Sequence, residues 1–142
     1  MNSLLQQKLT RAFQLTYDLF AHLAEADLCL ALADLPANRI AAQVWCVVGA
    51  RESYLKAIQH GEWQGFACSL RTPKVQSAVL AALEASAEQL SEIAFNHLNE
   101  KQLSLAFDLL EHEVQHHGQL VRYVYANQLT FPTSWQKRYA LS

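Results

Sequence analysis

The sequence predicts an all-α protein, a four-helix bundle with a short C-terminal helix, in a single domain spanning residues 1–142. Apolar residues recur at steps of three and four along four long segments, which is the period of an amphipathic helix. No segment alternates apolar and polar residues over the length of a strand. With 4 glycines and 3 prolines, the chain also lacks the turn-forming residues that a sandwich or barrel of many short strands needs. Four amphipathic helices bury their apolar stripes best against one another.

The first half of the chain predicts two helices. We expect the first over residues 3–26, with its apolar stripe on Leu5, Leu9, Ala12, Thr16, Leu19 and Leu23. A loop or short turn of helix then ends at Pro36. Asn38 is a preferred N-cap residue, so the second helix is expected to start there, run to His60 and stop at Gly61.

The second half begins with a connector and predicts two more long helices. Thr72 followed by Pro73 is the pattern of an N-cap and a first-turn proline, so we expect the third helix to begin there. The fourth helix is expected to begin within residues 99–102 and to continue to about Asn127.

The C-terminal segment carries three aromatic residues at helical spacing, Phe131, Trp135 and Tyr139. They predict one short final helix. An apolar aromatic stripe needs cover, which either the parent bundle or a second copy of the chain could provide.

Composition excludes several classes of protein. Hydrophobic residues make up 51% and charged residues 17% of the chain, which is incompatible with an intrinsically disordered protein. The net charge of −2 and the scattered basic residues indicate no nucleic-acid surface. No apolar run approaches the roughly 18 residues that span a bilayer, so we expect no membrane insertion. Three cysteines without a CxxC pair, in a sequence that starts without a secretory signal, indicate a cytoplasmic protein.

The fourth helix carries the chemistry. Its apolar stripe consists of Leu105, Leu109, His112, His116, Leu120 and Tyr123. Two histidines four residues apart on this stripe should both point into the bundle, one above the other. A buried imidazole must be hydrogen-bonded, paired or bound to metal. The sequence therefore leaves two alternatives open, core histidines with polar partners or ligands that share one metal ion.

The same residues spell HExxH, the signature of zinc peptidases in which the glutamate acts as general base. A peptidase is disfavoured because no histidine follows His117 to serve as third ligand, and no strand is expected to hold an extended peptide. Glu113 and His116 also form the ExxH pair of di-iron bundles, but the third helix offers no second ExxH.

The run HEVQHHGQLVRY, together with VVGARESYLKAIQHGEW on the second helix, resembles the DinB/YfiT-like four-helix bundles. The resemblance implies a metal-dependent protein that dimerises. The family's two ligand histidines fall on His112 and His116. Its third ligand, a histidine on the second helix, falls on Cys46, and a cysteine thiolate also binds zinc well.

If the chain is an enzyme, the resemblance implies thiol-dependent transfer or isomerisation of a small electrophile. A divalent metal, zinc or nickel, would then lower the pKa of a small-molecule thiol or a water. Glu113 would orient a ligand or act as base, and the chain would form a homodimer. The alternative is a metal-free helical module for dimerisation or binding, because the second helix has no histidine before His60.

Three other residues are given structural roles. Arg51 is expected on a salt-bridged or solvated helix face. His117 lies beside a second apolar stripe and is expected to pack inward or at an interface. Gly118 in mid-helix is expected to permit a close helix approach.

Overall fold

A computed structural model describes residues 2–142, and within that range the chain is entirely helical, without strands. This confirms the all-α prediction. The α-helices are α1 Asn2–His22, α2 Ile40–His60, α3 Gln76–Ser91, α4 Glu100–Ala126 and α5 Thr133–Tyr139, and two short 3-10 helices cover η1 Glu25–Cys29 and η2 Phe95–His97.

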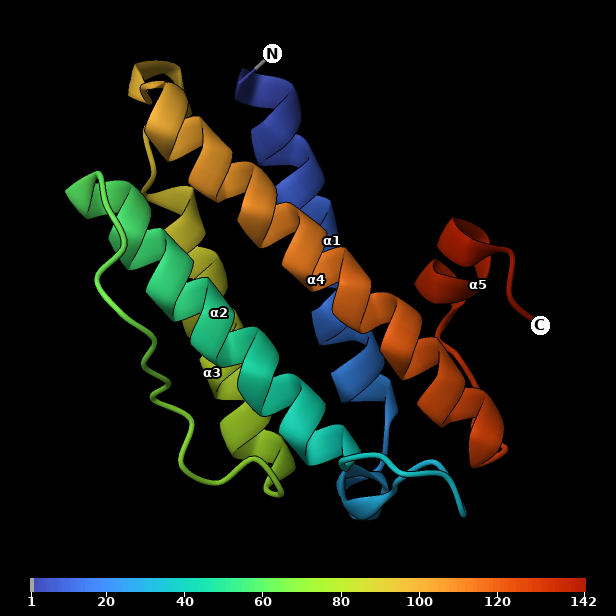
Figure 1. Cartoon of the computed structure of the whole chain (residues 1–142). Helices are drawn as coiled ribbons and strands as arrows, with labels where there is room; N and C mark the ends of the chain where they lie inside the picture. Colours follow the sequence, from blue (N-terminus) through green and yellow to red (C-terminus); the bar gives the residue numbers. More distant parts are fainter. Residues whose placement is uncertain (1) are drawn as a thin grey trace.

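Each of the four long helices packs against two others. α1 contacts α3 and α4, and α2 also contacts α3 and α4. α1 and α4 run in one direction and α2 and α3 in the other (Figure 1). The connector over residues 61–75 therefore returns along the length of α2 before α3 begins. This order brings α2 and α4 side by side and makes their interface available for a site.

The buried apolar residues form two clusters, one toward each end of the helices. The first includes Leu15, Leu19, Val44, Val47, Leu83, Leu120 and Trp135, and the second includes Leu5, Leu9, Leu55, Ile58, Leu90 and Leu109. Most of the buried polar residues lie near the boundary between the two clusters, among them Thr16, Arg51, Ser86, Glu113 and His117. A polar layer thus crosses the middle of an otherwise apolar core.

The predicted ends of α2 and α4 are largely confirmed. Gly61 ends α2 with a left-handed φ of 86°, and its N–H donates to the carbonyl of Ala57. Asn99 caps α4, since its side chain accepts from the N–H of Gln102 while the Gln102 side chain accepts from the N–H of Asn99. The start of α2 differs slightly, because Arg39 rather than Asn38 is the N-cap residue.

The predicted start of α3 is wrong. The helix begins at Gln76, three residues beyond Pro73, and Val75 is its N-cap. A distant residue caps it, because the N–H of Gln76 donates to the carboxylate of Glu25 at 3.0 Å. The Gln76 side chain also donates to the carbonyl of Phe20 at 2.9 Å. Tertiary contacts with the end of α1 therefore decide where α3 starts.

The aromatic tail packs on its own chain. Trp135 is completely buried, and its indole N–H donates to the carbonyl of Leu15 in α1 at 2.5 Å. Phe131 is also buried and stacks on Trp135. Of the two alternatives for this stripe, the parent-bundle packing is the one observed. The expectation for Gly118 is wrong, because a Cβ added there would find no neighbouring atom within 4 Å.

None of the described helices is both long and apolar enough to cross a membrane.

Candidate functional site

The interface of α2 and α4 brings together the three predicted metal ligands. Cys46 comes from α2, and His112 and His116 come from α4. One ligand atom from each residue can be chosen such that no two of them are more than 4.8 Å apart. The two imidazole rings lie 4.6 Å apart between centroids, as expected for residues one helical turn apart. The helical spacing thus predicted correctly that the two histidines lie side by side, whereas Cys46 was expected there only from the family resemblance.

The contact between Cys46 and His112 has the dimensions of a zinc site. The Cys46 Sγ lies 3.6 Å from the His112 Nε2. Tetrahedral zinc with a Zn–S bond of about 2.3 Å and a Zn–N bond of about 2.05 Å would separate the two atoms by about 3.6 Å. The sulfur and this nitrogen could therefore both ligate one zinc ion at their present separation.

A series of hydrogen bonds between side chains orients the His116 ring. The Gln43 Oε1 lies 2.6 Å from the His116 Nδ1, and the Gln43 Nε2 donates to the Asn38 Oδ1 at 3.0 Å. The Tyr123 hydroxyl donates to the same Asn38 oxygen at 2.5 Å. Because the Gln43 amide nitrogen is committed to Asn38, its oxygen accepts from the Nδ1–H of His116. The Nε2 of His116 then keeps its lone pair, which is how proteins commonly prepare a histidine ligand.

His112 is incompletely satisfied by the protein. Its Nδ1 is buried and has no hydrogen-bond partner among the described residues. Its Nε2 meets only the sulfur of Cys46. Buried polar atoms without partners are uncommon, because desolvation without a hydrogen bond is unfavourable. Coordination through Nε2 would give this imidazole a strong partner on the Cys46 side.

The protonation states suit a metal that needs lone pairs. Burial and, to a smaller extent, the neighbouring His112 lower the pKa of His116 to about 4. Burial also lowers the pKa of His112. Both imidazoles are therefore neutral at pH 7. Burial raises the pKa of the Cys46 thiol, so a metal would have to displace its proton.

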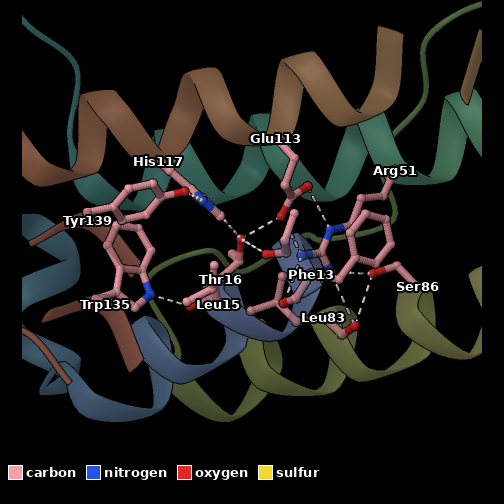
Figure 2. A network of polar contacts seen from close by, with 11 residues as sticks. Phe13, Leu15, Thr16, Arg51, Leu83, Ser86, Glu113, His117, Trp135 and Tyr139 are labelled. Atoms are coloured by element: carbon pink, nitrogen blue, oxygen red, sulfur yellow. Dashed lines mark hydrogen bonds and ion pairs between the residues drawn. The ribbon is translucent and has the colours of Figure 1, made fainter. Parts of the chain in front are cut away.

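A second group of polar residues lies next to these ligands along α4 but faces the core of the protein. Figure 2 shows Arg51 and Glu113 facing each other in the core, with Thr16 and His117 on the far side of the carboxylate. The Arg51 Nη2 lies 2.5 Å from the Glu113 Oε2, and the Arg51 Nε lies 3.1 Å from the Oε1. Both side chains are completely buried. Burial raises the pKa of the Glu113 carboxyl, but the Arg51 guanidinium more than offsets this and holds the pKa below its ordinary value.

The Arg51 guanidinium also contacts the two remaining long helices. Its Nη1 donates to the Ser86 hydroxyl of α3 at 3.0 Å, and its Nη2 donates to the carbonyl of Phe13 in α1 at 3.3 Å. The Phe13 ring lies 3.7 Å from the guanidinium carbon. Hydrogen bonds on every nitrogen allow a charged group to remain in an apolar interior.

His117 extends this network to the C-terminal helix. The Tyr139 hydroxyl lies 2.7 Å from the His117 Nδ1, and the His117 Nε2 lies 2.7 Å from the Thr16 Oγ1. Thr16 in turn donates to Glu113 at 2.5 Å. Burial lowers the pKa of His117 to about 4, so the ring is neutral at pH 7. Its Nδ1 can then accept from the Tyr139 hydroxyl while its Nε2–H donates to the Thr16 oxygen. The inward alternative for His117 is the one observed.

Glu113 does not join the three candidate ligands. Its contacts with Arg51 and Thr16 favour a structural role over the expected role as ligand-orienting residue or base. Two functional residues were missed by sequence reasoning. Gln43 orients His116, a role that no sequence motif indicates. Arg51 is an internal ion-pair partner, and the available indication was its position between the apolar Val47, Val48 and Leu55 of α2.

The sequence matches no protein-family model, and no curated protein matches it significantly.

Proposed function

We propose that this chain is a DinB-like four-helix bundle that binds one divalent metal, zinc or nickel, through Cys46, His112 and His116. The observation that carries the proposal is the convergence of three ligand atoms, no two more than 4.8 Å apart, from two different helices. One thiolate and two neutral imidazoles form a ligand set that zinc favours. The tautomer of His116, whose Nδ1–H is held by Gln43, adds support from the surroundings of the ligands.

The proposed centre is of the catalytic kind because the protein offers three ligands. Structural zinc sites usually have four protein ligands, whereas catalytic sites keep one position open for water or substrate. A bound metal would supply Lewis acidity at that open position and lower the pKa of a thiol or water there. We propose thiol-dependent transfer or isomerisation of a small electrophile as the reaction class.

The chain's own residues would supply positioning rather than proton transfer. Gln43 holds the His116 ring, and Asn38 and Tyr123 hold Gln43 in turn. Glu113 is engaged by Arg51 and faces the core. A zinc peptidase requires this glutamate beside the metal-bound water, so the literal HExxH motif carries no peptidase function in this proposal.

The test is metal analysis of untagged protein. We expect about one zinc per chain after reconstitution of the wild type, and loss of stoichiometric zinc in His116→Ala. His60→Ala is the matched control, because His60 is an exposed histidine at the end of α2. Absence of bound metal in both the wild type and the control would refute the metal proposal.

The metal-free alternative makes a different prediction for stability. A metal that binds only the native state raises the melting temperature, so a chelator should lower the melting temperature of the loaded wild type. A metal-free dimerisation module would keep its melting temperature and its dimer mass in chelator, and His112→Ala would change neither.

A further inference from the structure

A hollow of about 310 Å³ lies between the start of α2 and the end of α4. Leu32 and Ala37 provide part of its wall from the segment before α2. The polar part of the lining consists of Asn38, Gln43, Gln119, Arg122 and Tyr123. The volume matches the lower end of the range for sites that hold small molecules.

The charge of the lining is entirely positive. Arg122 is the one charged side chain among the lining residues, and no carboxylate belongs to the lining. The Arg122 side chain makes no hydrogen bond or ion pair with any residue of the described chain, in contrast to Arg51, which pairs with Glu113. The side chain of Gln119, one turn before Arg122, likewise has no hydrogen-bond partner within residues 2–142. A guanidinium and an amide with unused donors are therefore available on one wall of the hollow.

Gln43 connects the hollow to one of the candidate ligands, although none of the three ligands lines the hollow itself. This side chain lines the hollow, and its Oε1 lies 2.6 Å from the Nδ1 of the candidate ligand His116. Arg122 follows His116 by six residues, which corresponds to about 9 Å along the helix axis. Side chains on a helix lean toward its N-terminus, so a long side chain at position 122 can reach back toward position 116. The two positions are also about 120° apart around the helix axis, so a molecule that links Arg122 to the metal centre would run along the flank of α4 over about this axial distance.

We propose that this hollow binds the carboxylate of a small molecule whose other end reaches the metal centre, with Arg122 as the counter-ion and Gln119 as a second donor. The part of this inference that concerns the metal-bound end of the small molecule rests on the proposed function. A carboxylate fits the lining because one guanidinium neutralises one negative charge and can bind both oxygens. The carboxylate belongs either to the thiol or to the electrophile.

The first experiment tests the hollow without metal. Butyrate is titrated into ¹⁵N-labelled protein in the absence of added metal, with 1-butanol as the uncharged match. We expect butyrate to shift the side-chain amide signals of Gln119 and Gln43, and Arg122→Gln to abolish the shift. Arg11→Gln, which removes an exposed arginine from α1, should leave the shift intact.

The second experiment uses cobalt-loaded protein and ω-mercapto carboxylates of three to six carbons, each compared with the mercapto alcohol of equal length. The thiol-to-cobalt charge-transfer band reports binding. If the carboxylate belongs to the thiol, the wild type should prefer the best acid about two- to fivefold over its alcohol, as expected for one exposed charge pair. Arg122→Gln should remove this preference while leaving the affinity for the alcohol and the cobalt stoichiometry unchanged.

The outcomes separate the two proposals. A butyrate shift that depends on Arg122, without a preference among the thiols, assigns the carboxylate to the electrophile and supports the subsite. Failure to bind metal while butyrate still shifts Gln119 refutes the metal centre and leaves the carboxylate subsite standing. Equal responses of the wild type and Arg122→Gln to butyrate, and equal acid-to-alcohol ratios, would overturn the subsite.

Discussion

Replacing Glu113 by glutamine should destabilise the protein strongly, although the two side chains have nearly the same shape. The substitution leaves the Arg51 guanidinium fully buried without its counter-ion, and arginine cannot lose its proton to escape the cost. Removing one partner of a buried pair typically costs about 3–5 kcal/mol. The free energy of unfolding of a natural domain is about 5–15 kcal/mol. The expected loss is therefore a large part of the total, and the melting temperature should fall by about 6–20 °C.

The reverse substitution should behave differently. In Arg51→Met the Glu113 carboxyl loses the charge that keeps its pKa low, so burial raises that pKa and the group can take up a proton. We expect Arg51→Met to cost less than Glu113→Gln and to cost less still at pH 5 than at pH 8. The double variant, which buries no unpaired charge, should be more stable than Glu113→Gln alone.

Urea denaturation of these three variants and of Glu111→Gln measures the effect. Glu111 is exposed on the same helix, so its substitution should change the free energy of unfolding by less than about 0.5 kcal/mol. If Glu113→Gln were no more destabilising than Glu111→Gln, or if the two core substitutions were additive, the ion pair would not be the stabilising feature described above. Zinc stoichiometry at saturating zinc should stay at one per chain in Glu113→Gln, which separates a structural role from a ligand role.

Two further predictions concern stability. Burial lowers the pKa of His117 to about 4, so between about pH 4 and 6.5 the unfolded chain binds more protons than the folded chain. The free energy of unfolding should therefore fall as the pH drops through that window, by at most about 3 kcal/mol for this group. Urea denaturation at pH 7 and pH 4.5 measures this, and an identical pH dependence in His117→Gln would contradict it. Trp135→Ala removes a fully buried ring and its hydrogen bond to Leu15, and should cost about 3–5 kcal/mol by thermal unfolding. The exposed Trp63 provides the control, and equal effects of Trp63→Ala and Trp135→Ala would refute this description of the tail.

The helices and the pairing of His112 with His116 could be predicted because local periodicity determines both. A residue's position on a helix fixes which face it occupies, so His112 and His116 had to share the face of Leu109 and Leu120. Cys46 was expected at the site only from the family resemblance. Periodicity along α2 cannot place it, because it does not determine how α2 is rotated relative to α4. The start of α3 depends on Glu25, a residue 51 positions earlier, and no local pattern reveals such a cap.

The polar layer was hidden for a related reason. An arginine in a helix is usually solvated. An arginine on an apolar stripe indicates a buried ion pair only once an acidic residue is known to lie opposite it in space. Arg51 and Glu113 are 62 residues apart, and each alone resembles an ordinary surface residue. Gln43 was not among the expected site residues because a glutamine on a helix carries no signal of a site. Its importance comes from the hydrogen bond to His116, which requires the structure to be seen.

The run of residues 112–117 serves two purposes on two faces of one helix. His112 and His116 differ by four positions and so share a face, and Glu113 and His117 share the face about 100° further round. The first face meets Cys46 on α2, and the second meets Thr16 on α1. Because the second pair is held by fully buried contacts, α4 cannot rotate about its axis without separating Glu113 from Arg51. The two histidines are therefore held toward Cys46 in the chain itself, and this preorganisation would help a site of only three protein ligands to bind the proposed metal while leaving a position open.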